Sequence, residues 1–258
     1  MTDTDSSRRS PPQNPPKNPV VVIPARMAST RLPGKPLADI AGQPMIVHCW
    51  RRAVEADVGP VIVACAEPEI ATAIESAGGS AVLTAPDLPS GSDRAAAALA
   101  AVDPDLAYDA VVNLQGDLPT LDPALVRTAF AALSTAGVDI ATLACPITQD
   151  DERSNPNVVK AVIALEPGAT QGRALYFSRA KVPAGDGDHY HHIGLYAFRR
   201  AALTRFVTLQ ESGLEQRERL EQLRALEAGM RIDVALVDTV PLGVDTPADL
   251  ERARALLG

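Results

Sequence analysis

The sequence predicts an α/β protein built on a mostly parallel, doubly wound, Rossmann-like sheet. From Val20 onward, short β-branched runs alternate with longer helical stretches, which is typical of βαβ units. Aromatic residues make up only 3% of the chain and hydrophobic residues 46%. The core must therefore consist of small aliphatic side chains, which suit helices packed on a parallel sheet. The length of 258 residues fits one large domain or two small ones.

Seven apolar runs are the predicted buried strands, because each is short and rich in Val, Ile and Ala. They lie at 20–23, 61–66, 110–114, 140–145, 158–165, 193–198 and 232–237. Helical stretches lie between the first four of them, at 44–56, 67–77, 92–101 and 123–135. A further helix is expected over 214–226, with Leu220 and Leu223 as its core positions.

Two helix starts carry their own signals. Asp122 precedes Pro123, which gives an N-cap followed by Pro at the first helical position. Thr246 and Asp249 form a capping box with the same placement of proline. These patterns explain Asp122, Thr246 and Asp249 as structural residues. Asp245, one position before the second cap, has no such explanation.

Two stretches depart from the alternating pattern. Residues 1–19 hold five prolines among Ser, Asn and Gln, and no apolar residue follows Met1. Such a segment buries too little surface to offset its ordering entropy. We expect a disordered tail, whose deletion over 2–18 is nearly neutral for activity, and one domain over 20–258. Within that domain the irregular stretch 146–192 predicts an insertion of strands and hairpins, which serves as a subunit interface or a lid.

Charge and composition exclude several classes of protein. The formal net charge is −8, which argues against a nucleic-acid partner because such proteins carry a basic face. No apolar run reaches the roughly 18 residues needed to cross a bilayer, and the N-terminus lacks the apolar segment of a secretory signal. Cys49, Cys65 and Cys145 lie scattered in apolar surroundings, which predicts buried, reduced thiols. We therefore expect a cytoplasmic protein that has no membrane partner.

The strongest signal for chemistry is the segment VVVIPARMASTRLPGKPL at 20–37. No Asp or Glu occurs between Asp5 and Asp39, so positive charge is concentrated just past the first strand, where open α/β sheets bind ligands. Small residues let backbone N–H groups approach phosphate oxygens, while Arg and Lys neutralise the phosphate charge. The alternative is a solvated basic loop. The segment interleaves the cations Arg26, Arg31 and Lys35 with the small residues Ala25, Ala28, Ser29 and Thr30.

Two aspartates are candidates for a metal site. The run VVNLQGDLP places Asp117 just beyond a predicted strand, and VPLGVDTPADL places Asp245 on a turn. Mg²⁺ in nucleotide sites is usually held by one or two carboxylates together with phosphate oxygens and waters. We expect both aspartates to face the cationic loop, although each taken alone is also consistent with a turn residue.

Eight motifs then carry a resemblance to a known family. The chain resembles the 3-deoxy-manno-octulosonate (Kdo) cytidylyltransferases, also called CMP-Kdo synthetases, and the motifs occur in that family's order from Val20 to the end. They are IPARMASTRLPGKPL, LPSGSDR, NLQGDLP, NPNVVKAV, ALYFSRAKVP, HIGLYAF, LEQRERLEQLR and GVDTPADLERAR. The related CMP-sialic acid synthetases share the cationic loop but lack ALYFSR and LEQLR.

The resemblance implies a reaction, a fold and a set of site residues. CTP and Kdo give CMP-Kdo and pyrophosphate with Mg²⁺, for lipopolysaccharide synthesis, in a homodimer of mixed α/β subunits with an inserted dimerisation portion. Asp117 and Asp245 are then the metal ligands. The nucleotide-binding residues are Arg26, Ser29, Thr30, Arg31 and Lys35, joined by the segment that contains Ser90, Gly91, Asp93 and Arg94. The sugar-binding residues are Gln115, Tyr176, Arg179, His192 and Glu218.

Physical roles accompany this assignment. In-line displacement at the α-phosphorus depends mainly on positioning and on neutralising phosphate charge. Lys35 and Arg31 are expected to stabilise the departing pyrophosphate. Arg179 is the natural bidentate partner for the sugar carboxylate. No protein general base is evident, so the attacking hydroxyl is expected to be made acidic by Asp117 and Mg²⁺. Glu218 fits a solvated helix face as well as it fits a sugar contact.

Three positions depart from the family pattern. Leu118 replaces the Glu of QGDEP, Ala66 replaces the Asp of ATD, and Gln216 stands where a His is common. These changes leave open whether the sugar is Kdo or an 8-amino analogue. Two other functions also stay open: a cytidylyltransferase for sialic or pseudaminic acid, and a non-catalytic nucleotide-binding regulator.

Overall fold

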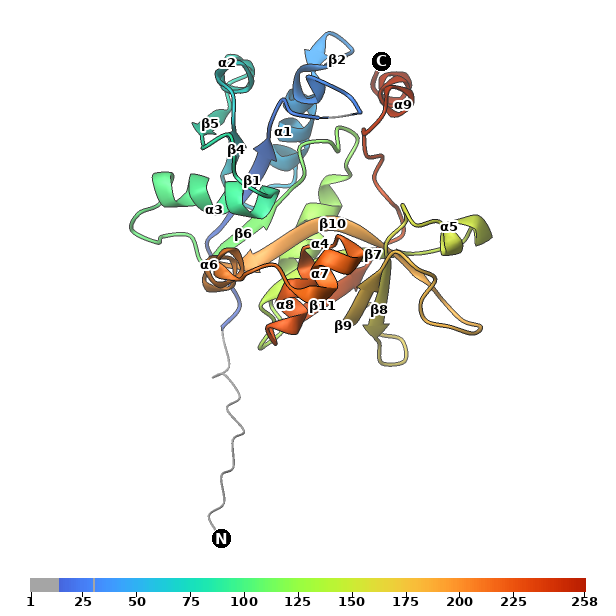
Figure 1. Ribbon diagram of the computed structural model, residues 1–258. Coiled ribbons are helices and arrows are strands. Elements are labelled where there is room, and N and C mark those ends of the chain that lie inside the picture. Colours follow the sequence, from blue (N-terminus) through green and yellow to red (C-terminus); the bar gives the residue numbers. More distant parts are fainter. Residues whose placement is uncertain (1–13, 30) are drawn as a thin grey trace.

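The computed structural model describes residues 14–29 and 31–258, which form a nine-stranded mixed sheet with helices on both faces (Figure 1). The strand order is β5-β4-β1-β6-β10-β7-β11-β9-β8. Its first half is parallel and consists of β1 (Pro19–Ala25), β4 (Val61–Cys65), β5 (Ser80–Leu83) and β6 (Ala110–Asn113). Each of these strands is short and apolar and ends at the same edge of the sheet.

The second half of the sheet is mixed. It consists of β7 (Ile140–Pro146), β8 (Lys160–Ala164), β9 (Gln171–Ser178), β10 (Tyr190–Arg199) and β11 (Ile232–Leu236). Strand β10 runs antiparallel to β6 and β7, and β9 runs antiparallel to β8 and β11. All other strands of the sheet point the same way, so the predicted mostly parallel sheet is confirmed. The irregular stretch 146–192 does contain inserted strands.

Alternating residues of β1 divide the core into two layers. Val21 and Ile23 face α1 (Met45–Glu55), α2 (Pro68–Ser76) and α4 (Pro123–Ala132). Val20 and Val22 face α3 (Gly91–Val102), α6 (Arg200–Thr208) and α8 (Gln222–Glu227). In Figure 1, α7 and α8 lie in front of the sheet and α4 lies behind it. This arrangement is the doubly wound architecture that the sequence predicted.

Smaller elements complete the chain. They are the 3₁₀ turn η1 (Lys35–Leu37), the two-stranded ribbon β2 (Asp39–Ile40) and β3 (Gln43–Pro44), α5 (Asp150–Ser154), α7 (Gly213–Glu218) and α9 (Pro247–Leu257). Helix α9 begins at the predicted Thr246–Asp249 capping box and packs beside β2. The predicted N-cap Asp122 accepts from the amide of Ala124 at 2.8 Å.

Two expectations are corrected. The helix expected over 214–226 is interrupted at Arg219, which adopts a left-handed φ of 55°, so α7 and α8 are separate. Leu220 and Leu223 are buried as expected. The tail expected over 1–19 is anchored in its described part, because β1 begins at Pro19 and the amides of Lys17 and Asn18 donate to the Asp109 carboxylate at 2.8 and 2.9 Å. Residues 1–13 lie outside the described residues.

The three cysteines are buried and free, as predicted. Among the described residues, no helix combines the length and the apolar character that spanning a membrane requires.

Candidate active site

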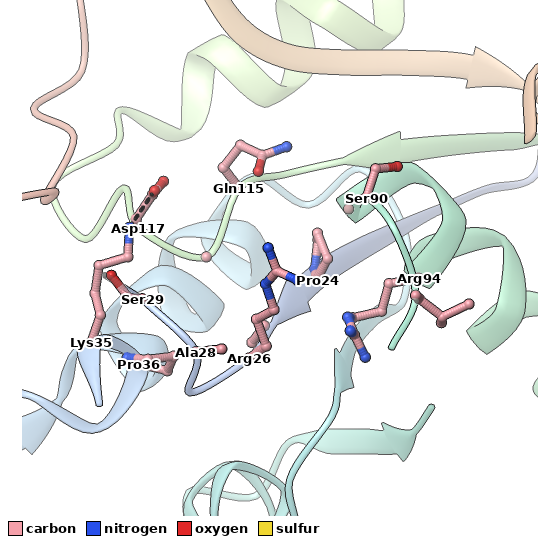
Figure 2. A pocket seen from close by; sticks show the side chains of 14 residues that line it. Pro24, Arg26, Ala28, Ser29, Lys35, Pro36, Ser90, Arg94, Gln115 and Asp117 are labelled. Carbon is pink, nitrogen blue, oxygen red and sulfur yellow. Dashed lines mark hydrogen bonds and ion pairs between the residues drawn. The ribbon is translucent and has the colours of Figure 1, made fainter. Parts of the chain in front are cut away.

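A pocket of about 290 Å³ opens where β1 and β6 end (Figure 2). The loops after these strands and the N-terminal turn of α3 form its walls, so it lies at the carboxyl edge of the parallel half-sheet, where such sheets bind ligands. Figure 2 shows the side chains of Arg26 and Gln115 pointing toward one another. Eight of the predicted site residues line the pocket: Arg26, Ser29, Lys35, Ser90, Gly91, Arg94, Gln115 and Asp117. The predicted Thr30 lies outside the described residues.

A glycine lets the β6 loop pass close to β1. A Cβ at Gly116 would lie 3.0 Å from the carbonyl oxygen of Pro24 and 3.0 Å from Cδ1 of Ile46. Because the first of these atoms belongs to the backbone of a buried strand, it cannot move aside cheaply. Glycine at 116 therefore brings Gln115 and Asp117 to the edge of the pocket.

The two candidate aspartates converge on one lysine. Nζ of Lys35 donates to Oδ2 of Asp117 at 2.8 Å and to Oδ1 of Asp245 at 3.1 Å. A guanidinium nitrogen of Arg31 lies 3.0 Å from Oδ2 of Asp245. The amide of Val244 donates to the carbonyl oxygen of Asp117 at 2.9 Å, which joins the two chain segments. The structure thus brings together the carboxylates that the sequence placed at one site.

The ion pairs keep Lys35 charged. Its side chain is 16% exposed, and burial by itself lowers the pKa of Lys35, but the carboxylates of Asp117 and Asp245 outweigh burial and raise that pKa above its ordinary value. Arg31 is the more exposed partner, at 64% of its side chain. The positive charges of Lys35 and Arg31 therefore balance the negative charges of Asp117 and Asp245 beside the pocket.

Arg94 supports the pocket wall. The residue is buried, and its guanidinium donates to Oγ1 of Thr84 at 2.6 Å and to the carbonyl oxygens of Ala85 and Pro86 at 3.0 and 3.3 Å. Burial lowers the pKa of Arg94, and nearby Arg26 acts in the same direction. Arg94 lines the pocket as predicted, but its guanidinium donates these hydrogen bonds to the loop between β5 and α3.

Three predicted sugar-binding residues form a separate network, outside the lining of this pocket. The Glu218 carboxylate accepts from the hydroxyls of Tyr176 and Ser178 at 3.5 and 2.7 Å and from the amide of Arg179 at 2.9 Å. The Arg179 guanidinium donates to the carbonyl oxygens of Glu218 and Pro156 at 2.9 and 3.1 Å. The Arg179 guanidinium therefore connects the end of α7 to β9. The sequence had instead suggested that this guanidinium binds the carboxylate of the sugar. The Glu218 side chain thus supports β9 through hydrogen bonds and is not merely solvated.

His192, also predicted on the sugar side, is a core residue. Its Nε2 lies 3.0 Å from Oγ1 of Thr142, and its ring packs edge-on against Phe177 with centroids 4.8 Å apart. Burial lowers the pKa of His192 to about 3, so the ring is neutral at neutral pH. Its hydrogen bond and packing explain its position without a ligand.

A buried polar group that no sequence pattern indicated joins α3, β6 and the N-cap of α8. Oγ of Ser92 donates to Oε1 of Glu221 at 2.8 Å, and Nδ2 of Asn113 donates to the same Ser92 oxygen at 3.3 Å. Within the described part of the chain, three buried atoms here have no hydrogen-bond partner: Oδ1 of Asn113, Oε2 of Glu221 and Nε2 of Gln222. Burial raises the pKa of Glu221. Buried polar atoms are normally hydrogen-bonded, so these three are exceptions, and Ser92 directly follows Gly91 of the pocket lining.

Comparison with known proteins places this geometry in a family. The family model described as cytidylyltransferase matches residues 20–232. A 3-deoxy-manno-octulosonate cytidylyltransferase from Paramagnetospirillum magneticum is 67% identical over 239 residues, covering 93% of this chain and 97% of the relative. The enzyme of the same name from Parvibaculum lavamentivorans is 68% identical over 240 residues and covers 93% of each chain.

The chain belongs to the 3-deoxy-manno-octulosonate cytidylyltransferase family. A solved structure described as CMP:2-keto-3-deoxy-manno-octonic acid synthetase complexed with CTP superimposes with a TM-score of 0.85 at 40% identity, covering 93% of this chain and 98% of that one. The 4-diphosphocytidyl-2C-methyl-D-erythritol synthase of Anaerococcus prevotii, at 14% identity and a TM-score of 0.62, shares the fold. The family resemblance and the fold class expected from the sequence are both confirmed.

As a cytidylyltransferase, the chain offers a donor set that suits Mg²⁺. Asp117 and Asp245 present carboxylates from two separate segments to a single cation, the Lys35 ammonium. Among the described residues, no cluster of three or more His, Cys, Asp or Glu side chains has metal-ligand geometry. Two carboxylates whose coordination is completed by phosphate oxygens and waters are a usual setting for Mg²⁺. Asp117 and Asp245 are thus the residues that would hold the ion.

Proposed function

We propose that this protein transfers CMP from CTP to the anomeric hydroxyl of Kdo and releases pyrophosphate, with Mg²⁺ as cofactor. The observation that carries the proposal is the convergence of Asp117 and Asp245 on Lys35 at the edge of a pocket lined by the loop after β1. Membership of the 3-deoxy-manno-octulosonate cytidylyltransferase family supports the identity of both substrates.

The cationic loop would hold the triphosphate. Arg26, Ser29 and Lys35 line the pocket, so their donors can meet phosphate oxygens while the nucleoside lies toward Ser90 and Gln115. Asp117 and Asp245 would hold Mg²⁺, which would supply charge neutralisation there. Lys35 and Arg31 would stabilise the negative charge of the departing pyrophosphate. Fixed cations at the leaving group are an effective way to stabilise a developing negative charge.

The sugar would lie beyond Gln115. Asn113 is the last residue of β6, two positions before Gln115, and Ser92 connects it to the Glu221 carboxylate. Oδ1 of Asn113 and Oε2 of Glu221 have no partner and could accept from the hydroxyl groups of a sugar. Because Ser92 directly follows Gly91 of the pocket lining, a sugar bound there would have its anomeric hydroxyl near the proposed triphosphate site, and in-line transfer depends on such positioning.

The decisive experiment is an assay of pyrophosphate release. With CTP and Mg²⁺, release is expected to require Kdo and to be absent with sialic acid, pseudaminic acid or UTP. Faster release with an 8-amino analogue than with Kdo would assign the enzyme to that analogue. Binding of CTP without release for any sugar acid would identify a nucleotide-binding regulator and overturn the proposal.

Assembly and location are part of the same proposal. The related enzymes lead us to propose a homodimer in the cytoplasm that supplies CMP-Kdo for lipopolysaccharide synthesis. Sedimentation equilibrium of the full chain tests the first point, because a monomer at micromolar concentration would contradict it.

A further inference from the structure

The Glu67 carboxylate, which lies outside the cationic loop (residues 26–35), holds the start of that loop by a hydrogen bond. The amide of Met27 donates to Oε2 of Glu67 at 3.0 Å, across 40 positions of the chain. Glu67 precedes α2 and is the second residue after the end of β4. The residue between them is Ala66, whose amide donates to the carbonyl oxygen of Ala25 at 3.2 Å. Ala66 has no carboxylate of its own, so Glu67 supplies the acidic acceptor at this strand end.

Met27 is the point at which the loop closes on itself. Its carbonyl oxygen accepts from the amide of Gly34 at 3.3 Å. Arg26 comes directly before Met27, and Lys35 comes directly after Gly34. The bond to Glu67 therefore fixes, through one backbone residue, both ends of the loop and the two cations that flank it.

The negative charge of Glu67 is unexpected beside the cationic loop. A carboxylate near a site for a triphosphate repels the ligand, so it is unfavourable unless it stabilises the site in another way. Within the described part of the chain, Glu67 does not cap α2 with its side chain. Its contact with Met27 gives the side chain of Glu67 a role in the loop.

We propose that Glu67 is a positioning residue for nucleotide binding: by accepting the Met27 amide it holds the loop between Arg26 and Lys35 in the shape that receives the triphosphate. This inference rests on the proposed function for its ligand, CTP. A hydrogen bond to a charged acceptor is strong enough that its loss is expected to weaken CTP binding by about tenfold or more.

Three variants of the full-length protein test the proposal. Glu67→Ala removes the acceptor, and Glu67→Gln removes the charge but keeps an oxygen that can accept from the Met27 amide. Glu69→Ala is the matched control, because Glu69 is an exposed acid in the first turn of the same helix. The measurements are KM for CTP, kcat, calorimetric CTP affinity with Mg²⁺, and amide hydrogen exchange of the peptide covering 26–35.

The expected pattern is specific. Glu67→Ala should raise KM for CTP about tenfold and speed exchange over 26–35, whereas Glu67→Gln and Glu69→Ala should stay within about threefold of wild type in KM. Equal loss in Glu67→Ala and Glu67→Gln would mean that charge alone matters and would overturn the positioning role. Tighter CTP binding in Glu67→Ala, or exchange over 26–35 unchanged from wild type, would also overturn it.

Hydrogen exchange separates this proposal from the proposed reaction. If wild type released no pyrophosphate with any sugar acid, the transferase assignment would fail, while the comparison of exchange rates between Glu67→Ala and Glu69→Ala would still decide whether Glu67 holds the loop.

Discussion

The amide of Val244 donates to the carbonyl oxygen of Asp117 at 2.9 Å. This one backbone bond joins the loop after β6 to the segment that leads into α9. The following residue, Asp245, then faces Asp117 across Nζ of Lys35. The Thr246–Asp249 capping box holds Asp245 from the other side, since the amide of Asp245 donates to Oδ2 of Asp249 at 3.2 Å.

Removing either carboxylate should stop the chemistry. Asp117→Asn and Asp245→Asn are each expected to lower kcat at least about a hundredfold, because a metal bound by two carboxylates loses half of its protein ligands. The backbone bond and the capping box remain, so circular dichroism and Tm should be close to wild type. Asp238→Asn, an exposed aspartate between β11 and α9, is the control. Wild-type rates in both active-site variants would refute the metal assignment.

Removing Lys35 should expose the two carboxylates to a divalent cation. In Lys35→Met the ammonium no longer competes for Asp117 and Asp245. Mg²⁺ at about 5–10 mM should therefore raise the Tm of this variant by about 2–4 °C more than it raises the Tm of wild type. This difference corresponds to about 1 kcal/mol in a chain of this size. CTP turnover should fall at the same time, because the phosphate cradle loses a cation.

The double variant Lys35→Met/Asp117→Asn is the control for this measurement. It keeps the loss of the ammonium but removes one ligand, so the extra Mg²⁺ stabilisation should disappear. An equal response to Mg²⁺ in all three proteins would place the ion elsewhere.

The regular elements were predictable where local pattern and tertiary packing agree. The strands β1, β4 and β6 are continuous apolar runs buried on both faces, which the sequence displays directly. Strand β5 was missed because it is an edge strand of only four residues, none of them buried, so its apolar run is too short to stand out. Helix α6 was missed because it starts directly from β10 and makes no side-chain cap.

The residues of the candidate site also fall into those that the sequence pattern predicts and those that only tertiary packing determines. Arg26 and Asp117 were predictable because each lies just past a strand that the sequence reveals, and strand ends meet at one edge of a sheet. Lys35 was predictable because it belongs to the same segment without acidic residues as Arg26. The role of Arg179 was not, because its carbonyl partners are set by the break between α7 and α8 at Arg219. Glu221 follows a core leucine, so helical periodicity assigns it to the solvated face, and only the packing against α3 buries its carboxylate.

His192 should make stability depend on pH. Burial lowers the pKa of His192 to about 3 in the folded protein, whereas an unfolded histidine titrates near 6.5. Between these values the unfolded chain binds a proton that the folded protein does not, so stability falls as pH falls below about 6.5. His192→Gln should lose less stability between pH 7 and 5 than wild type, by roughly 1–2 kcal/mol.

Urea unfolding at each pH measures this effect. The slope of the free energy of unfolding against urea concentration should be the same in both proteins, which shows that only the linkage has changed. Identical pH dependence in wild type and His192→Gln would mean that the imidazole is accessible to protons in the folded state.

The N-terminal segment should stabilise the fold from Asn14 onward. The Asp109 carboxylate accepts the amides of Lys17 and Asn18, and the buried Arg199 guanidinium donates to the carbonyl oxygen of Asn14 at 2.8 Å. Deleting residues 2–18 removes these partners, and the buried Arg199 keeps an unused donor. We expect this deletion to cost about 1–3 kcal/mol of unfolding free energy, while the neutral effect expected from the sequence concerns activity alone. Deleting residues 2–13 keeps every one of these bonds and is the matched control, so equal Tm values for the two deletions would show that the contacts at Asp109 and Arg199 add nothing to stability.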